Sequence, residues 1–218
     1  MATPIDIAFG AFVRSHLPPP PARVLEVGCG DGHLAHALAD AGYRVTAIDP
    51  RAPFGPIFRQ VTLEAFDAEE RFDAAVAIVA LHHIADLRSA VRKIAGLLTP
   101  RGRLIVEEFA KERFIERSTA EWYWRQRNVD EDFERWLSAW IEDHGDVHPF
   151  AAIRPQLEQR FVRRHFTRIP YLHGYDLDPA IEPIERALIA RGEIQATGIR
   201  YVGDLPTLHA APGPASSA

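Results

Sequence analysis

Short apolar runs alternate with segments of helical periodicity through the first half of the chain. The apolar runs lie at 23–27, 45–48, 57–63, 72–79 and 103–107. The run at 72–79 is almost continuously apolar, which is typical of a strand buried on both faces of a sheet. Apolar residues recur every third or fourth position at 31–41 and 86–98, which indicates helices between the strands. Five strands with intervening helices predict an α/β fold with a parallel, doubly wound sheet.

The second half of the chain is less regular. Residues 111–142 are polar and aromatic, and one predicted helical face collects most of the apolar side chains. That face is formed by Val129, Phe133, Trp136, Leu137, Trp140 and Ile141. Apolar runs at 161–171 and 194–202 predict two further strands, and a helix is predicted between them at 179–190.

Local signals mark where several elements begin and end. Residues 4–17 predict a leading helix that ends at the four prolines of 18–21. Gly42 stands where a helix C-terminal glycine belongs, and Asp86 is a predicted N-cap. The segment Thr-Pro-Arg-Gly at 99–102 is predicted to break the chain before the fifth strand.

These elements predict one main domain with a short segment at each end. An N-terminal helix and Pro-rich linker occupy 1–22, and the domain occupies 23–208. A helical and aromatic insert is expected at about 111–158. The Ala/Pro/Ser-rich tail at 209–218 is predicted to be disordered.

Composition narrows the class of partner. The 218 residues carry a net charge of −5, which argues against a nucleic-acid partner. Arg163, Arg164 and Arg168 lie close together, but a solvated face explains them. The sequence has one cysteine, no basic segment followed by an apolar run at its start, and no apolar stretch of transmembrane length. We therefore expect a cytoplasmic protein without a membrane partner.

The strongest chemical signal is a glycine loop directly after the first strand. Gly28, Gly30 and Gly32 follow Val27, and the next predicted helix begins at the loop. Glycines in such a turn let the backbone approach a ligand closely. A dinucleotide site requires the pattern G-x-G-x-x-G, but its third glycine position is occupied here by His33.

Two carboxylates accompany the loop. Glu26 lies two residues before Gly28, where a negative charge is poorly placed beside a pyrophosphate and suits a ligand with an ammonium group. Asp49 ends the second strand, where a carboxylate can accept hydrogen bonds from ribose hydroxyls. Asp49 supports an adenosine ligand of either kind, whereas Glu26 favours S-adenosylmethionine over a dinucleotide.

With these residues, the run 24–50 resembles the first two motifs of class I S-adenosylmethionine-dependent methyltransferases. Residues 72–84 resemble the fourth-strand motif of that family, and 97–106 is similar to the helix–turn–strand of its small-molecule branch. The resemblance implies a Rossmann-like sheet of seven strands, the last antiparallel, with a helical cover inserted after strand five. It also implies S-adenosyl-L-methionine as cofactor.

The resemblance further implies roles for individual residues. Gly28, Gly30 and Gly32 would form the cofactor loop, and Asp49 would hold the ribose. Ile78, at the end of the fourth strand, would lie near the methionine portion. The adenine amino group would meet Glu64 or a backbone group near it.

Residues after the fourth and fifth strands are candidates for catalysis. His82 and His83 follow the fourth strand, where one of them could act as a general base or could only cap and pack. Glu107 and Glu108 end the fifth strand, and Glu108 is a candidate for orienting a substrate. No spacing indicates a metal site. At least one ring among Trp122, Tyr123, Trp124, Trp136 and Trp140 is expected to line the substrate cavity.

The sequence thus predicts S-adenosylmethionine-dependent methyl transfer to a small organic molecule. The reaction needs no obligatory base, because alignment of an acceptor lone pair with the methyl–sulfur bond supplies much of the rate. A catalytically inactive S-adenosylmethionine-binding protein with a regulatory or assembly role is the main alternative. A nicotinamide-dependent oxidoreductase is the second.

Overall fold

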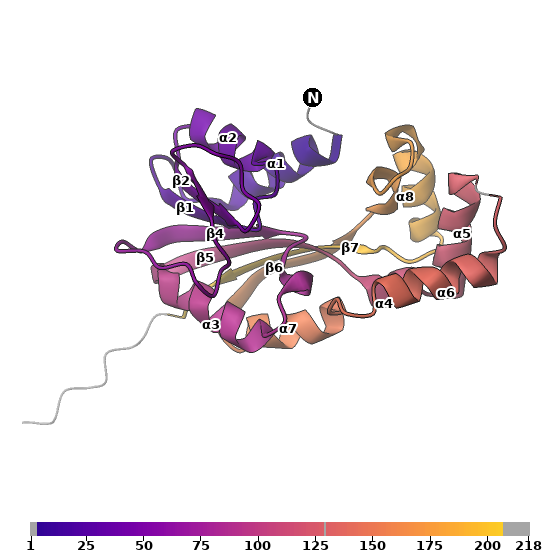
Figure 1. Ribbon diagram of the computed structural model, residues 1–218. Helices are drawn as coiled ribbons and strands as arrows, with labels where there is room; N and C mark the ends of the chain where they lie inside the picture. The colour runs from indigo at the N-terminus through magenta and orange to yellow at the C-terminus, as the bar shows by residue number, and fades with distance from the viewer. Residues whose placement is uncertain (1–3, 129, 207–218) are drawn as a thin grey trace, which may run out of the picture.

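A seven-stranded sheet forms the centre of the computed structural model, which describes residues 4–128 and 130–206 (Figure 1). The strands are β1 (Arg23–Val27), β2 (Arg44–Asp49), β3 (Phe58–Gln60), β4 (Phe72–Ile78), β5 (Leu98–Phe109), β6 (Val162–Ile169) and β7 (Gly198–Asp204). Their order is β3-β2-β1-β4-β5-β7-β6. Strands β1 to β5 are parallel, and β7 is antiparallel to both of its neighbours. The predicted Rossmann-like α/β sheet is confirmed.

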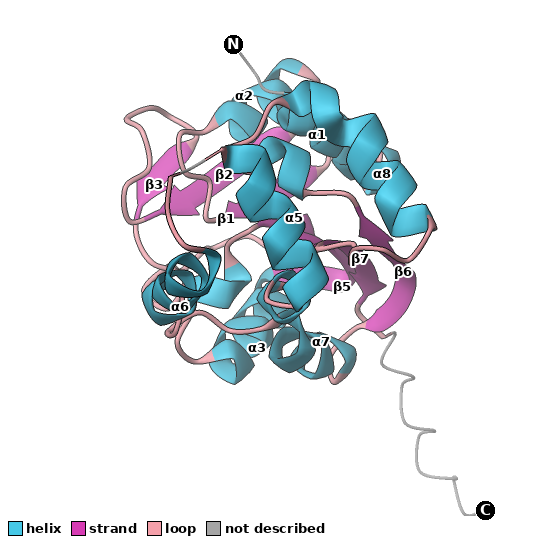
Figure 2. Cartoon of the chain, turned by 90° about the vertical axis from the view of Figure 1, so that its right-hand side faces the viewer, coloured by secondary structure: helices cyan, strands magenta, loops and turns pink. Residues whose placement is uncertain are grey.

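Helices cover both faces of this sheet. The long helices are α1 (Pro4–His16), α2 (His33–Asp40), α3 (Leu87–Leu97), α5 (Arg117–Arg127), α6 (Phe133–Asp143), α7 (Phe150–Glu158) and α8 (Glu182–Ala190). The short ones are α4 (Lys111–Phe114) and the 3₁₀ turns η1 (Leu81–His83), η2 (Leu172–Gly174) and η3 (Pro179–Ile181). Helices α1 and α8 lie on one side of the sheet and α3 and α7 on the other (Figure 2).

The strands divide their apolar side chains between two cores. In β1, Leu25 and Val27 pack in the core with α3 and α7, whereas Val24 packs in the core with α1 and α2. All three are buried, because successive side chains of a strand point to opposite faces and both faces are covered. The same alternation places Glu26 on the face that α1 and α2 cover.

The predicted insert is divided between two packing environments. Helix α7 contributes Ile153 and Leu157 to the core beneath the sheet. Helices α4, α5 and α6 instead form a separate aromatic cluster, grouped with α8 at one end of the molecule (Figure 1). The buried members of this aromatic cluster are Phe114, Ala120, Tyr123, Phe133, Trp136, Trp140 and Leu172.

Several predicted boundaries differ from the observed ones. The segment 99–102 does not separate helix from strand, because β5 already begins at Leu98. Its pairing with β4 shifts register between Phe72 and Ala74, so the Pro-Gly segment is accommodated as an irregularity within the strand. The predicted helical face was partly wrong, since Ile141 is 45% exposed. Val129 and the predicted disordered tail at 209–218 lie outside the described residues.

Other predicted signals are confirmed. The Asp86 side chain accepts a hydrogen bond from the Ser89 backbone N–H at the start of α3. Gly42 has a φ of 89° directly after the C-cap of α2. None of the helices in the described ranges has both the length and the apolar composition needed to cross a membrane.

Substitution of Ile94 tests the core between the sheet and α3. Ile94 is fully buried, so Ile94→Ala should lower the free energy of unfolding by about 2–5 kcal/mol through lost apolar contact and a residual cavity. Arg92→Ala, on the exposed face of the same helix, should change it by less than about 0.5 kcal/mol. Urea unfolding measures both, and equal effects would contradict this packing.

Candidate functional site

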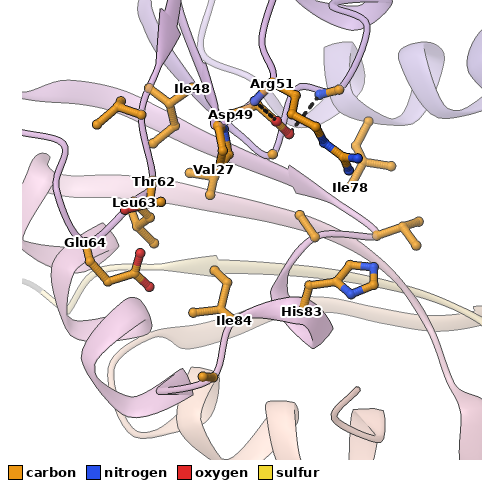
Figure 3. A pocket seen from close by; sticks show the side chains of 17 residues that line it. Val27, Ile48, Asp49, Arg51, Thr62, Leu63, Glu64, Ile78, His83 and Ile84 are labelled. Carbon is orange, nitrogen blue, oxygen red and sulfur yellow. Dashed lines mark hydrogen bonds between the residues drawn. The ribbon is translucent and has the colours of Figure 1, made fainter. Parts of the chain in front are cut away.

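A cavity of about 720 Å³ opens at the carboxyl ends of β1, β2 and β4 (Figure 3). Chain connections run in opposite directions from β1 and β4, and ligands of doubly wound sheets bind at such a switch point. The lining residues are Val27, Gly28, Gly30, Ile48, Asp49, Pro50, Arg51, Val61, Thr62, Leu63, Glu64, Ile78, Val79, Ala80, His83, Ile84 and Ala85. The size is that of a cofactor site.

The glycine loop forms one wall of this cavity. Gly28 has a φ of 74°, and a Cβ there would lie 2.5 Å from the Cβ of Ala80. Gly30 has a φ of 51°, and no atom lies within 4 Å of the position a Cβ would take. Gly28 is therefore required by the close approach of the chain after β4, whereas Gly30 leaves open space beside the loop.

Asp49 holds the loop against the end of β2. Its Oδ2 accepts a hydrogen bond from the Gly30 N–H at 3.3 Å, and its Oδ1 accepts one from the Arg51 N–H at 2.7 Å (Figure 3). A carboxylate has about four lone-pair positions, so both oxygens retain capacity to accept bonds from a ligand. Asp49 is placed to bind a group with two donors.

Glu26 lies behind the glycine loop with an unsatisfied oxygen. Its side chain is 3% exposed, and Oε2 has no hydrogen-bond partner within the described residues. Burial, with a smaller contribution from the charge of Asp31, raises its pKa to about 8. Glu26 is therefore largely protonated at neutral pH until a donor or cation reaches it.

Carboxylates surround the glycine loop and set its electrostatic potential. Burial raises the pKa of the Cys29 thiol to about 12, and the charges of Glu26, Asp49 and Asp31 contribute to the shift. Cys29 is 6% exposed, so it is an unreactive thiol. The carboxylates of Asp31 and Asp49 give the loop a negative potential, which opposes a pyrophosphate and favours a cationic ligand.

Apolar side chains form the opposite walls. Ile48, Val61 and Leu63 line one side, and Ile78 and Ile84 come from the end of β4 and the turn after it. Glu64 stands at the rim with an exposed side chain (Figure 3). The cavity therefore combines an apolar slot with carboxylates at its edges.

A second cavity of about 170 Å³ adjoins the first. Val79 and His83 line both. The other residues around the second cavity are His82, Phe109, Lys111, His144, Val147, His148, Tyr171 and Tyr175. Val79 has a φ of 46°, a strained conformation for a β-branched residue, and donates its N–H to the Glu107 carbonyl at 2.8 Å. Strain of this kind concentrates at functional sites.

Glu108 holds the turn between the two cavities. Its Oε1 accepts hydrogen bonds from the Ala80 and Leu81 N–H groups at 3.1 and 2.8 Å. Its Oε2 lies 2.7 Å from His82 Nδ1. Glu108 is fully buried and lines neither cavity, so the expectation that it orients a substrate directly is not met. It is a positioning residue for η1 and for His82.

His83 faces both cavities from the same turn. Desolvation lowers its pKa, and the neighbouring His82 ring, 4.0 Å away between centroids, lowers it further. At neutral pH the imidazole is therefore unprotonated and able to accept a proton. His82, bound to Glu108, lines only the second cavity.

The structure brings most of the predicted site residues together. Gly28, Gly30, Asp49, Glu64, Ile78 and His83 line the first cavity. Gly32 does not line it and instead approaches the Phe58 ring, 2.5 Å from where a Cβ would lie. Glu107 pairs with Arg200 across β5 and β7 at 2.8 Å, away from both cavities.

None of the five rings expected near the substrate lines either of these cavities. Tyr123, Trp136 and Trp140 are buried in the aromatic cluster, where Trp140 contacts Phe109 and His144 from behind the second cavity. The rings that line the second cavity are Phe109, Tyr171 and Tyr175. Sequence reasoning missed these rings and Lys111, since they come from separate elements with no shared motif.

Metal ligation finds no support within the described ranges, where no three His, Cys, Asp or Glu side chains are grouped to hold an ion. Two of the histidines around the second cavity instead lie against backbone carbonyl groups. His144 Nδ1 bonds the Trp140 carbonyl at 2.8 Å, and His148 Nε2 lies 3.2 Å from the Ala85 carbonyl.

Comparison with known proteins identifies the family to which the sequence is similar. A family model described as a methyltransferase domain matches residues 9–160. An uncharacterized methyltransferase of Mycobacterium tuberculosis is 39% identical over 117 residues, which are 48% of this chain and 59% of that protein. A ubiquinone biosynthesis O-methyltransferase of Xanthomonas axonopodis is 34% identical over 110 residues, or 44% and 46% of the two chains. The matched segment thus spans about half the length of these relatives.

Solved structures share the fold at low identity. The N-methyltransferase NodS from Bradyrhizobium japonicum, in complex with S-adenosyl-L-homocysteine, is 14% identical with a TM-score of 0.55, covering 94% of this chain and 89% of that one. An S-adenosylmethionine-dependent methyltransferase from Mesorhizobium loti is 16% identical with a TM-score of 0.58, covering 89% and 96%. At these identities the likeness concerns the fold.

The raised pKa of Glu26 predicts a pH dependence of stability. Between the ordinary carboxyl pKa and about 8, the folded protein binds a proton that the unfolded chain releases. Stability should therefore fall as pH rises through this window, by up to about 1.4 kcal/mol per pH unit from this one group. Glu26→Gln keeps the size and shape of the side chain but does not titrate. The stability of this variant relative to wild type, measured by urea unfolding, should therefore increase from pH 5 to pH 8. A pH-independent difference would contradict the shift.

Proposed function

The chain belongs to the methyltransferase-domain family, as a class I S-adenosylmethionine-dependent member, and on this premise we propose that it transfers a methyl group from that cofactor to a small organic acceptor. The resemblance seen in the glycine loop is thereby confirmed at the level of the family. The residue roles and the kind of acceptor are proposals that rest on the two adjoining cavities.

The residues of the larger cavity fit an S-adenosylmethionine ligand. Asp49 has free acceptor capacity for two ribose hydroxyls, and the space beside Gly30 admits a ligand against the loop. Glu26 does not line the cavity, but it offers a buried, unpartnered oxygen two residues before Gly28. Glu64 stands at the rim, and Ile78 lines the wall at the end of β4.

The observation that carries the proposal is the group of carboxylates around the glycine loop. Burial is the main reason that Cys29 resists ionisation, and the charges of Glu26, Asp49 and Asp31 add to it. Glu26, protonated at neutral pH, becomes a further negative charge when a donor or cation reaches it. A dinucleotide would place a doubly charged pyrophosphate in this potential, whereas a sulfonium with an ammonium group carries the complementary charge. The nicotinamide alternative is therefore disfavoured by electrostatics as well as by His33.

When bound, S-adenosylmethionine supplies an electrophilic methyl group on a good leaving group. The chain's own part is to bind and orient the acceptor next to it and to exclude water. The second cavity shares Val79 and His83 with the first, so an acceptor held there lies beside the cofactor cavity. His83, unprotonated at neutral pH, is placed to take a proton from the acceptor.

An oxygen acceptor agrees best with this arrangement. A hydroxyl or phenol must lose its proton during methylation, and His83 supplies a nearby base. Several relatives carry the name O-methyltransferase, which supports the same assignment. The second cavity, at about 170 Å³, favours a small molecule.

Calorimetric titration with S-adenosylhomocysteine tests the cofactor, with NADH as the competing ligand. We expect micromolar binding of S-adenosylhomocysteine alone. Gly30→Ala should weaken it at least about tenfold, because the added methyl projects into open space beside the loop. Gly192→Ala is the matched control: its φ of 73° imposes comparable backbone strain far from the cavity, and it also has no neighbour within 4 Å.

The outcomes of this titration are distinct. Binding of NADH without S-adenosylhomocysteine would overturn the proposal. If the Gly30→Ala and Gly192→Ala variants bind S-adenosylhomocysteine equally well, the glycine loop is not part of the binding site. Binding without methyl transfer to any acceptor in a screen with labelled methyl donor would favour a non-catalytic binding protein.

Replacement of His83 tests the base. With an acceptor from that screen, His83→Gln should lower kcat by about 10²- to 10⁴-fold and leave the affinity for S-adenosylhomocysteine unchanged. In the wild type, activity should fall only below pH 6.5, because the pKa of His83 is lowered. His36→Gln, exposed on α2, is the control. An unchanged kcat for His83→Gln would leave proximity as the sole source of rate.

A further inference from the structure

Lys111 presents a cation to the second cavity that no carboxylate neutralises. It opens α4 and lines the cavity, and its Nζ donates to the His144 carbonyl at 2.8 Å. An ammonium has three N–H donors, so two remain. Within residues 4–128 and 130–206, no Asp or Glu lies within ion-pair distance of this Nζ. The chain has only two lysines, and the other, Lys93, pairs with Asp67 at 3.2 Å.

The rest of the cavity lining contains no described carboxylate. Besides Lys111, its ionisable members are four histidines and two tyrosines, namely His82, His83, His144, His148, Tyr171 and Tyr175. The acidic groups that contact lining residues are already engaged: Glu108 accepts three backbone N–H groups and lies against His82, and Glu185 accepts the N–H of Tyr171. Burial raises the pKa of the Tyr171 phenol, so it adds no negative charge. Among the described lining residues, the one Lys, Arg, Asp or Glu side chain is Lys111.

Three aromatic rings set the shape of this space. Phe109 lies 5.8 Å from Tyr175 in a stacked arrangement and 5.4 Å from Tyr171, between ring centroids. A cavity of about 150 Å³ accommodates one benzene ring. The observed volume of about 170 Å³ therefore holds one ring with little else. Flat apolar walls of this kind suit a planar occupant.

The tyrosines are held in place by a buried carboxylate on α8. Glu185 is fully buried, and its Oε1 accepts the N–H groups of Tyr171 and Leu172 at 2.9 and 3.0 Å. Its Oε2 accepts the His173 N–H and lies 2.8 Å from His173 Nδ1. The turn that carries both tyrosines is thus preformed, and the cavity is a shaped site before any ligand enters.

We propose that the methyl acceptor is a ring-sized carboxylic acid, bound with its carboxylate on Lys111 and its ring against Phe109, Tyr171 and Tyr175. This inference rests on the proposed function, since it assigns the occupant of the acceptor cavity. One uncompensated cation selects one negative charge, and the half-buried Lys111 gains more from an anion inside the cavity than a fully exposed lysine would. Lys111 is then a specificity-determining residue that binds the acceptor and takes no part in proton transfer.

Benzoate, benzamide and acetate are probes that distinguish recognition of the negative charge from recognition of the ring. Calorimetry with saturating S-adenosylhomocysteine should show benzoate binding at least tenfold more tightly than benzamide, its neutral isostere, and more tightly than acetate, which lacks the ring. Lys111→Met should abolish the preference for benzoate over benzamide, whereas Lys111→Arg should retain it. The affinity for S-adenosylhomocysteine should be the same in all three proteins, since Lys111 does not line the cofactor cavity.

Each contrary result is decisive. Equal binding of benzoate and benzamide to the wild type, or a preference that survives Lys111→Met, would overturn the anion site. If benzoate binds no more tightly than acetate, or does not bind at about 10 mM, the proposal that the acceptor is a ring-sized acid is refuted. The wild-type comparison needs no variant, so a folding defect of Lys111→Met does not affect it. Failure of S-adenosylhomocysteine to bind would instead refute the proposed function, because benzoate selectivity is measurable without it.

Discussion

The position of the site depends on the hydrogen bonds that Glu108 makes beneath the end of β4. A fully buried carboxylate is costly unless its oxygens are satisfied, and Glu108 satisfies them with three backbone N–H groups and the His82 ring. These bonds tie β5 to the η1 turn. Because His83 ends that turn, Val79 precedes it and both line the two cavities, this one side chain holds the wall between the cavities.

A second buried carboxylate makes the same kind of hydrogen bonds on the other side of the acceptor cavity. Glu185 binds three successive backbone N–H groups and the His173 ring, as Glu108 binds three backbone N–H groups and the His82 ring. Although burial raises the pKa of Glu185, the hydrogen bonds from His173 and the backbone lower it overall. Two buried carboxylates thus rigidify two 3₁₀ turns, and the small cavity lies where residues of both turns meet.

Charge distinguishes the two cavities. Carboxylates surround the glycine loop of the larger one, where Glu26 retains an unpartnered oxygen. The smaller cavity is lined by Lys111 and histidines and by no described carboxylate. A cationic donor and an anionic acceptor would each lie in a potential of opposite sign, and their own attraction would add to the alignment that methyl transfer requires.

Local patterns in the sequence determined the sheet, the glycine loop and the place of Asp49, because strand periodicity and turn chemistry depend on residues near in sequence. They also predicted that His82 and His83 follow the fourth strand and that Glu108 ends the fifth. They did not reveal that Glu108 turns inward to bind η1, that the tryptophans pack among themselves, or that Lys111 meets Tyr171 and Tyr175. Those relations depend on contacts between residues far apart in the chain, and only the packing of α4, α6 and the η2 turn against the end of the sheet decided them.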